Sequence, residues 1–265
     1  MIHETAIIDK NAKIPLSTSI GPYAVIGAEV ELGNNVIVHS HVSIIGKTKI
    51  GDGNIFFPFS SIGNDPQDLK YKGEKSSLVI GDNNKIREYV TMNPGTLSGG
   101  GITKVGSNCL FMIGSHIAHD CNVGNNVIIA NNVPLGGHAE IGDGVVIGGN
   151  SAVQQFTRIG KFAMIGGMTG VLNDVIPYGL SIGNRNHLQG LNLIGLRRAK
   201  TENKIILELT EAYKDIFRSK NLSENLKNLP QKYEKNYLVK DVIQFINKDK
   251  KRSIAQPLNL NESNR

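Results

Sequence analysis

Residues 105–171 read VGSNCLFMIGSHIAHDCNVGNNVIIANNVPLGGHAEIGDGVVIGGNSAVQQFTRIGKFAMIGGMTGV, and every sixth position is apolar. The series runs Val105, Phe111, Ile117, Val123, Ile129, Leu135, Ile141, Ile147, Val153, Ile159, Ile165 and Val171. A period of six fits neither an amphipathic helix, which repeats about every 3.6 residues, nor an alternating strand. It is the period of a hexapeptide β-helix, in which three hexads form one triangular coil.

One such coil cannot bury its own inward side chains, so several coils must stack, at roughly the 4.8 Å spacing of neighbouring strands. Residues 18 apart in the sequence are therefore expected to be vertical neighbours. Glycine follows many of the inward positions. We expect these glycines in the turns, where positive φ or close backbone approach costs them little.

The same register extends back to the N-terminus. Its inward positions there are Ile2, Ile8, Ile14, Ile20, Ile26, Leu32, Val38, Ile44, Ile50, Phe56 and Ile62. It breaks over 64–78, resumes at Ile80, and breaks again over 95–103. We expect both breaks to be loops that project from the prism, because insertions in a solenoid lie on its surface and often carry function.

Beyond residue 190 the six-residue register is lost. Residues 201–219 carry apolar side chains at helical spacing, with Thr201 in position to be the N-cap. Residues 222–229 and 238–247 are expected to form further helices, and 253–265 is expected to fray.

These patterns predict two domains, a β-helix over 1–190 and a small helical domain over 191–265. The charge is unevenly divided, because the chain from 197 onward holds 16 Lys and Arg against 9 Asp and Glu. A basic helical domain would attract an acidic protein or nucleotide phosphates, although solvated lysines on helix faces would give the same composition. Nucleic acid is not an expected partner, since no motif for it accompanies the charge.

The sequence also predicts a cytoplasmic protein. No apolar run approaches the roughly 20 residues of a membrane span. The repeat begins at Ile2, so no signal peptide is expected. Cys109 and Cys121 should lie on different faces of the prism, and we expect both to be reduced and unlinked.

The densest cluster of catalytic-type side chains is HIAHD, residues 116–120. Asp120 lies 18 residues before His138, and a neighbouring column holds His119, Gly137 and Gln155. These side chains should share one patch, and a histidine beside a carboxylate is the arrangement that a general base requires. A lone histidine would more simply be a solvent-facing or partner-facing residue. The independently fixed register favours a functional role for the cluster.

A metal site is the competing interpretation. His116 and His119, with another histidine, could bind Zn²⁺ that activates a water molecule. Residues three apart on a strand point to opposite faces, so these two cannot chelate together unless a turn intervenes. We therefore expect no metal, and keep a zinc-dependent hydratase on a hexapeptide trimer as an alternative.

Several segments together resemble the UDP-N-acetylglucosamine O-acyltransferases of lipid A biosynthesis. They are 67–71 (QDLKY), 99–106, 116–121, Gly137-His138, Gln155-Phe156, 190–192 and 195–198. Hexads alone would be weak evidence, because acetyltransferases and carbonic anhydrases share them. The combination of HIAHD with QDLKY in the first loop is specific.

The resemblance implies an all-β left-handed parallel β-helix with a small C-terminal α-helical domain, assembled as a homotrimer with active sites between subunits. It implies transfer of a 3-hydroxyacyl group from acyl carrier protein to the 3-position of UDP-N-acetylglucosamine, with the thioester as co-substrate and no cofactor. The basic C-terminal region would suit the acidic carrier protein. An enzyme acting on a 3-amino UDP-sugar analogue is an alternative.

The resemblance also implies roles for individual residues. His119 would be the general base, Asp120 would orient it, and the Gly137 N–H would be an oxyanion donor. The sugar and its phosphates would be held by Asp68, Lys70, His116, His138 and Gln155, and the nucleotide by Asn192 and Arg198. Gln154 stands where some members of the family carry a histidine.

The acyl chain has a candidate path of its own. Gly149 and Gly167 are 18 apart, above Asn131, so two successive coils carry no side chain on that column. Gly167 also belongs to a pair of glycines that resembles the family's acyl-groove segment. We expect a groove along the prism there, although both glycines would also be explained by turns.

Overall fold

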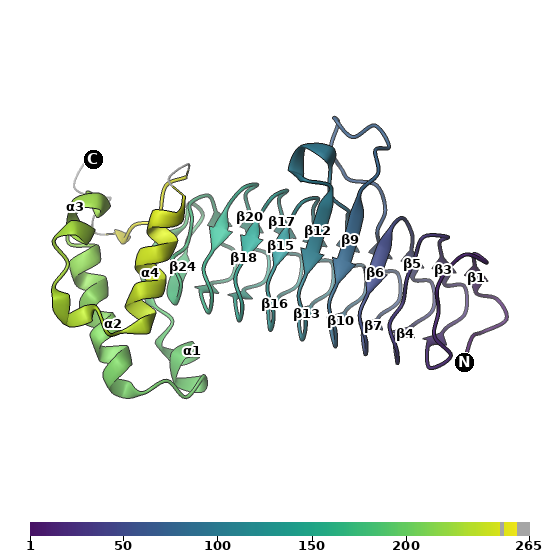
Figure 1. The fold of residues 1–265 in the computed structure, drawn as a ribbon, viewed down its shortest axis with the longest axis horizontal. Coiled ribbons are helices and arrows are strands. Elements are labelled where there is room, and N and C mark those ends of the chain that lie inside the picture. The colour runs from purple at the N-terminus through teal and green to yellow at the C-terminus, as the bar shows by residue number, and fades with distance from the viewer. Residues whose placement is uncertain (250–251, 259–265) are drawn as a thin grey trace.

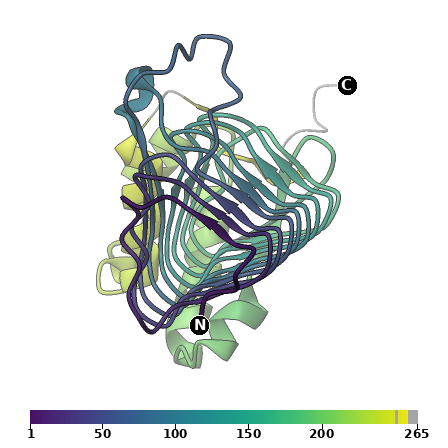
Figure 2. The same cartoon turned by 90° about the vertical axis from the view of Figure 1, so that its right-hand side faces the viewer.

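The computed structural model describes residues 1–249 and 252–258, and most of this length winds into a parallel β-helix (Figure 1). Figure 2, which looks along the axis, shows a triangular prism with coil stacked on coil. Residues 18 apart pair as predicted; Leu110 lies opposite Ile128, and Phe111 opposite Ile129. The predicted β-helix is therefore confirmed.

Three sheets form the faces of the prism in the described part of the chain. The ten-stranded face contains β2 (Ser19–Ile20), β4 (Ile37–Val38), β7 (Ile55–Phe56), β10 (Lys85–Ile86), β13 (Leu110–Phe111), β16 (Ile128–Ile129), β19 (Val146–Ile147), β22 (Met164–Ile165), β24 (Gly179–Ile182) and β25 (His187–Leu191). Its last two strands, β24 and β25, pair antiparallel.

The other two faces are parallel throughout. The nine-stranded face contains β1 (Ile7–Ile8), β3 (Val25–Ile26), β5 (Ser43–Ile44), β8 (Ser61–Ile62), β11 (Thr91–Met92), β14 (His116–Ile117), β17 (Pro134–Leu135), β20 (Ala152–Val153) and β23 (Gly170–Val171). The six-stranded face contains β6 (Thr48–Ile50), β9 (Ser77–Ile80), β12 (Ile102–Val105), β15 (Asn122–Val123), β18 (Glu140–Ile141) and β21 (Arg158–Ile159).

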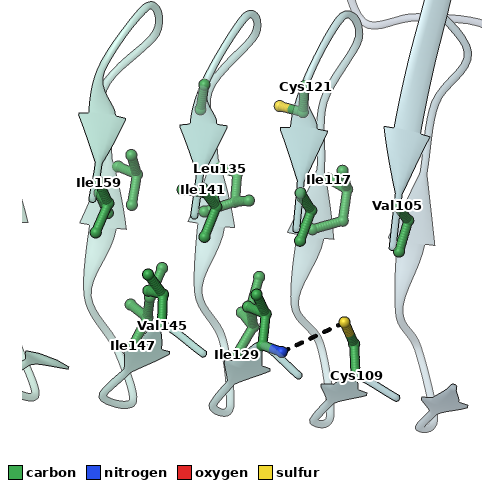
Figure 3. Close-up of a cluster of buried hydrophobic side chains, with 14 of the residues drawn as sticks. Val105, Cys109, Ile117, Cys121, Ile129, Leu135, Ile141, Val145, Ile147 and Ile159 are labelled. Carbon is green, nitrogen blue, oxygen red and sulfur yellow. Dashed lines mark hydrogen bonds between the residues drawn. The ribbon is translucent and has the colours of Figure 1, made fainter. Parts of the chain in front are cut away.

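The core is a column of the sixfold apolar residues. Ile117, Ile129 and Ile147 are all fully buried, and Figure 3 shows such side chains in rows that run from coil to coil. Burial of a large aliphatic side chain stabilises a fold by roughly 1.5–3 kcal/mol. Stacking of the coils thus buries the inward apolar side chains, which a single coil would leave exposed.

Both cysteines belong to this interior. Cys109 and Cys121 are free thiols, as predicted, and lie just before strands of different faces, β13 and β15 (Figure 3). Burial raises the pKa of both, that of Cys121 to about 12. They are therefore apolar packing residues that donate weak hydrogen bonds to backbone carbonyls.

Most of the glycines after inward positions serve close approach rather than positive φ, with Gly63 at +79° as an exception. A Cβ added to Gly106 would lie 2.5 Å from the Gly124 carbonyl oxygen of the next coil. Positive φ at the corners is instead adopted largely by other residues, among them Asn126 at 57° and Asn132 at 59°. Asparagine tolerates this region better than most side chains do.

Two loops project from the corner between the nine- and six-stranded faces, side by side above the prism (Figures 1 and 2). The first joins β8 to β9. The second joins β11 to β12 and contains the 3₁₀ turn η1 (Leu97–Gly99). The Ser77 N–H donates to the Gly101 carbonyl at 2.9 Å, and the Leu97 N–H to Glu74 Oε1 at 3.3 Å. These bonds hold the loops together.

Helices close the C-terminal end of the prism (Figure 1). They are α1 (Leu193–Arg198), α2 (Asn203–Ile216), α3 (Leu222–Lys227), the 3₁₀ turn η2 (Gln231–Tyr233) and α4 (Tyr237–Lys248). The predicted N-cap Thr201 is wrong, because Glu202 precedes α2 and makes no capping hydrogen bond. Within the residues described, no helix combines the length and apolar character needed to cross a bilayer.

The expectation that 253–265 frays is wrong for the part described. The Ser253 carbonyl accepts from the Asp174 N–H at 2.9 Å, and the Ala255 N–H donates to the Asp174 carbonyl at 2.8 Å. Ala255 is buried, and the Arg252 guanidinium donates to the Gln154 side chain at 2.8 Å. This segment is thus held by the end of the prism, while 259–265 lies outside the described residues.

Candidate active site

The HIAHD segment turns a corner of the prism directly beneath the two loops. Ile117 in β14 points into the core, so the adjacent His116 points outward. The chain then bends at Asp120, whose φ is +60°. His116 thus lies on the strand, while His119 and Asp120 form the turn between the nine- and six-stranded faces.

His119 and Asp120 form a hydrogen-bonded pair. His119 Nδ1 lies 2.8 Å from Asp120 Oδ2, and the side chains are 15% and 1% exposed. An ionised carboxylate can only accept, so Nδ1 carries the hydrogen. Nε2 of His119 is consequently left with its lone pair, which is the form that a general base requires.

His138 completes the corner one coil further on. Its Nε2 lies 3.8 Å from the same Asp120 oxygen, and its ring meets His119 edge-on with centroids 5.2 Å apart. On its other face it stacks on Phe156 at 4.3 Å. The 18-residue column that includes Asp120 and His138 thus continues to Phe156.

The second loop covers the Asp120 carboxylate. The Thr96 N–H donates to Oδ1 at 2.9 Å, and the Thr96 hydroxyl donates to Oδ2 at 2.6 Å. The Asp120 N–H donates to the hydroxyl of Thr103 at 2.8 Å. The side chain of the aspartate is therefore held by the second loop, and its backbone by Thr103 of β12.

Gly137 lies directly under the His119 ring. A Cβ at this position would be 2.6 Å from His119 Cε1, so only glycine lets the ring lie there. Gly137 is buried, and its N–H has no hydrogen-bond partner among the residues that the structure describes. Buried N–H groups are nearly always paired, so this one is available to a ligand or water.

Two adjoining cavities open at this corner. One of about 600 Å³ is lined by Asp68 and Lys70 of the first loop together with His119, His138 and Gln155. The other, of about 460 Å³, shares His119 and Gln155 with the first. His116, Gly137 and Gln154 line it as well. Eight of the residues singled out from the sequence thus lie in or beside these cavities.

The two flanking histidines favour the neutral state. Burial lowers the pKa of His116, and a charge on His119 lowers it further. Burial is also the main cause that lowers the pKa of His138, against an opposing effect of Asp120. His116 Nδ1 lies 2.7 Å from the Thr91 hydroxyl. Both rings are therefore suited to act as uncharged hydrogen-bonding groups.

One group in the described chain has the geometry to hold a metal ion. It consists of His119, Asp120 and His138, whose ligand atoms lie within 4.8 Å of one another. His116 does not belong to it, so the zinc arrangement considered from the sequence does not form. Asp120 already accepts hydrogen bonds from Thr96 and His119, so few of its lone pairs remain for a metal ion.

Four predicted residues lie elsewhere. Asn192 caps α1 by accepting from the Gly195 N–H at 3.0 Å, and Arg198 is exposed at the end of that helix. Gly149 and Gly167 stack at the corner between the ten- and nine-stranded faces. None of the four lines either cavity at His119.

Several residues of the site were not predicted, among them Phe156, Thr96 and Ser98. Phe156 follows the same 18-residue column as His138, so extending that column would have found it. Thr96 and Ser98 lie in the irregular second loop, and Ser98 lines the larger cavity. No periodicity reaches that loop, so the sequence held no signal for either residue.

A third cavity, of about 630 Å³, separates the six-stranded face from α4. Its charged side chains are already paired, as in Lys161 with Asp241 at 2.9 Å and Arg158 with Asp174 at 2.7 Å. It contains no base and carboxylate arranged like His119 and Asp120. The candidate active site is therefore the loop-covered corner.

The fold and this corner together define a hexapeptide-repeat transferase. The bacterial transferase hexapeptide family, in six repeats, matches residues 102–137. The second domain of the UDP-N-acetylglucosamine O-acyltransferase family matches residues 174–255.

Full-length relatives narrow the class to one family. An acyl-[acyl-carrier-protein]–UDP-N-acetylglucosamine O-acyltransferase of Rickettsia canadensis is 50% identical over 255 residues, which cover 96% of this chain and 97% of the relative. The chain belongs to this family of enzymes.

Solved structures of the same family resemble this chain over almost its whole length. The UDP-N-acetylglucosamine O-acyltransferase of Moraxella catarrhalis is 45% identical, with a TM-score of 0.93 over 96% of this chain and 99% of that one. The Arabidopsis enzyme is 34% identical, with a TM-score of 0.86 over 97% of this chain and 100% of that one. This likeness confirms the left-handed β-helix. The relatives' names support the O-acyltransferase interpretation, and support neither the 3-amino-sugar enzyme nor the hydratase.

Proposed function

We propose that this chain transfers a 3-hydroxyacyl group from acyl carrier protein to the 3-hydroxyl of UDP-N-acetylglucosamine, the first step of lipid A biosynthesis. The observation that carries the proposal is the His119–Asp120 pair, with Nε2 free, beside the unpaired N–H of Gly137. A thioester is already activated for acyl transfer. Such a reaction needs a base and an oxyanion donor, but neither a covalent nucleophile nor a metal.

In the proposed reaction the sugar 3-hydroxyl oxygen attacks the thioester carbonyl carbon while His119 Nε2 takes its proton. The Gly137 N–H stabilises the oxyanion of the tetrahedral intermediate. The C–S bond then breaks, and the departing thiolate of the carrier protein receives the proton from His119. Asp120 keeps the ring oriented and stabilises the imidazolium between the two steps.

The cavities at this corner support the assignment of binding residues. Lys70 is an exposed loop lysine that lines the larger cavity, where its ammonium group would contact the phosphates. Asp68, beside it, would accept hydrogen bonds from sugar hydroxyls. The neutral His116 and His138, with Gln155, would hold the rest of the sugar.

A homotrimer with shared sites belongs to the same proposal. Asn192 and Arg198, assigned to the nucleotide, line neither cavity at His119. Contacts from them would come from a neighbouring subunit. The acidic carrier protein would meet the basic helical region, where Lys and Arg outnumber Asp and Glu. A donor of this kind, and two free buried thiols, fit a cytoplasmic location.

The test is acyl transfer by the purified protein. 3-Hydroxyacyl carrier protein and UDP-N-acetylglucosamine should yield the O-acylated sugar nucleotide and free carrier thiol in equal amounts, as measured by mass spectrometry. The matched control is the 3-deoxy analogue of the sugar nucleotide, which should accept no acyl group. Equal acylation of both acceptors, or none of either, would contradict the proposal.

A further inference from the structure

The Asp120 carboxylate depends on Thr96 for two of its hydrogen bonds. The Thr96 N–H reaches Oδ1, and the Thr96 hydroxyl reaches Oδ2, the oxygen that also contacts His119 Nδ1. Thr96 is 2% exposed and the Asp120 side chain 1%. Solvent therefore cannot readily replace a missing donor.

The backbone around Thr96 closes tightly on the same carboxylate. A Cβ at Gly99 would lie 2.0 Å from Asp120 Cγ, and one at Gly95 would lie 2.7 Å from Oδ1. Two glycines thus let the loop wrap around the aspartate. Between them, Thr96 is the side chain whose hydroxyl reaches an Asp120 oxygen.

The same hydroxyl connects the catalytic pair with the substrate cavity. Thr96 Oγ1 and Ser98 Oγ are 3.1 Å apart, and Ser98 lines the cavity that holds Lys70 and His119. The next residue, Leu97, donates its N–H to Glu74 of the first loop. The position of Thr96 therefore depends on both loops rather than on the hexapeptide repeat.

We propose that Thr96 is a positioning residue for the reaction, which through its hydroxyl fixes the Asp120 carboxylate and thereby the orientation of His119. This rests on the proposed function. Without the hydroxyl donor, Oδ2 keeps its contact with His119 and the longer one with His138, while the Thr96 N–H still holds Oδ1. The carboxylate is then less firmly fixed in the geometry that holds the Nδ1–H tautomer. The rate of catalysis falls, while substrate binding does not.

The test compares Thr96→Val, which keeps the shape but removes the donor, with Thr96→Ser, which keeps the donor. A hydrogen bond to a charged group of this kind corresponds to a loss of roughly 10–100-fold in kcat for the valine variant. KM for both substrates should stay within about threefold, and the serine variant should regain most of the rate. Thr18→Val is the matched control, because Thr18 is equally buried and its hydroxyl has no partner among the described residues.

A double-mutant cycle separates positioning from a general structural effect. In an Asp120→Asn background, Thr96→Val should have little further effect on kcat, because its target has already been changed. Multiplied losses in the cycle, failure of serine to rescue, or a valine variant with wild-type kcat would each overturn the role of Thr96. An inactive wild-type protein would instead overturn the proposed function, and this role with it.

Discussion

His119 differs from other histidines at the corners of the prism in what it contacts. His41 is another corner histidine, but its ring lies between the rings of Tyr23 at 5.2 Å and Phe59 at 5.1 Å. It is part of an aromatic column. His119 instead has a carboxylate on one nitrogen and a cavity on the other side. The repeat thus places both histidines at corners, and it is the carboxylate and the cavity that distinguish His119.

The lowered pKa values of His116 and His138 predict how stability depends on pH. At pH values just below the ordinary histidine pKa of 6.5, His116 and His138 bind protons more readily in the unfolded chain than in the folded site. Stability should therefore fall as the pH drops below that value and level off above it. Thermal unfolding measured at about pH 5.5 and 7.5 should show the difference.

Replacement of both histidines by glutamine should reduce the difference between the two pH values. His3→Gln, at the exposed N-terminal end, controls for the loss of a histidine as such. A double variant that keeps the full wild-type difference would show that other groups cause it.

At the residue scale, the sequence predicted the columns but not the contacts that complete them. The 18-residue spacing was sufficient to bring Asp120 near His138 and His119 near Gly137. It could not place Thr96, because a loop conformation depends on long-range contacts such as the one between Leu97 and Glu74. Nor could it show that the Gly137 N–H is left unpaired.

At the scale of elements, the first loop presents Lys70 to the cavity. Its conformation is supported locally, since the Lys70 N–H donates to Asp68 Oδ1 at 3.0 Å and Tyr71 donates to the Glu74 carbonyl. The side chain itself is exposed and free to meet a phosphate.

We expect Lys70→Ala to raise the KM for the UDP-sugar more than it lowers kcat, because a phosphate contact is made equally in the ground and transition states. Steady-state kinetics with saturating acyl donor would measure both constants. Lys75→Ala is the matched control in the same loop, because Lys75 lines neither cavity at His119. If kcat falls while KM stays constant, Lys70 acts in the chemical step instead.

Strands were more predictable than the elements around them. The six-residue register placed the inward residues of the coils, because burial repeats with the sequence. The sequence pattern did not predict α1, because this helix is too short to show a helical period. The register also gave no sign that Ser253 and Ala255 dock onto Asp174, which lies at the end of the prism and far from them in the sequence.

On the scale of the whole molecule, the column of Gly149 and Gly167 runs along the prism axis. A Cβ at Gly167 would lie 3.4 Å from the Gly149 carbonyl, and one at Gly149 would lie 3.5 Å from that of Asn131. These are ordinary contacts, and neither residue has positive φ. The backbone does not require glycine at either position, which favours a groove for an extended acyl chain.

Gly167→Met should therefore shift the preference towards shorter acyl donors, since each coil adds about 4.8 Å to the path. Rates with 3-hydroxyacyl carrier proteins of graded length would show the shift. Gly167→Ala adds only the tolerated Cβ and should keep the wild-type optimum more closely. An unchanged optimum in the methionine variant, or an equal loss at all lengths, would exclude the groove.

The proposed homotrimer, with each site shared between two subunits, makes a prediction for mixed trimers. His119→Ala and Arg198→Ala proteins should each have little activity alone. After unfolding and refolding together, some interfaces would combine an intact His119 with an intact Arg198, and activity should return in part. If both residues served one site within a single subunit, every site in the mixture would stay defective.

We propose that the His119–Asp120 corner transfers the acyl group by general-base catalysis without a metal. The most direct measurement is the rate of acyl transfer by wild-type and His119→Ala proteins after dialysis against a chelator. We expect the wild-type rate to survive dialysis, and the folded variant to be slower by roughly 10²–10⁴-fold. A wild-type rate that disappears with the metal and returns with zinc, or an alanine variant as active as wild type, would contradict the account.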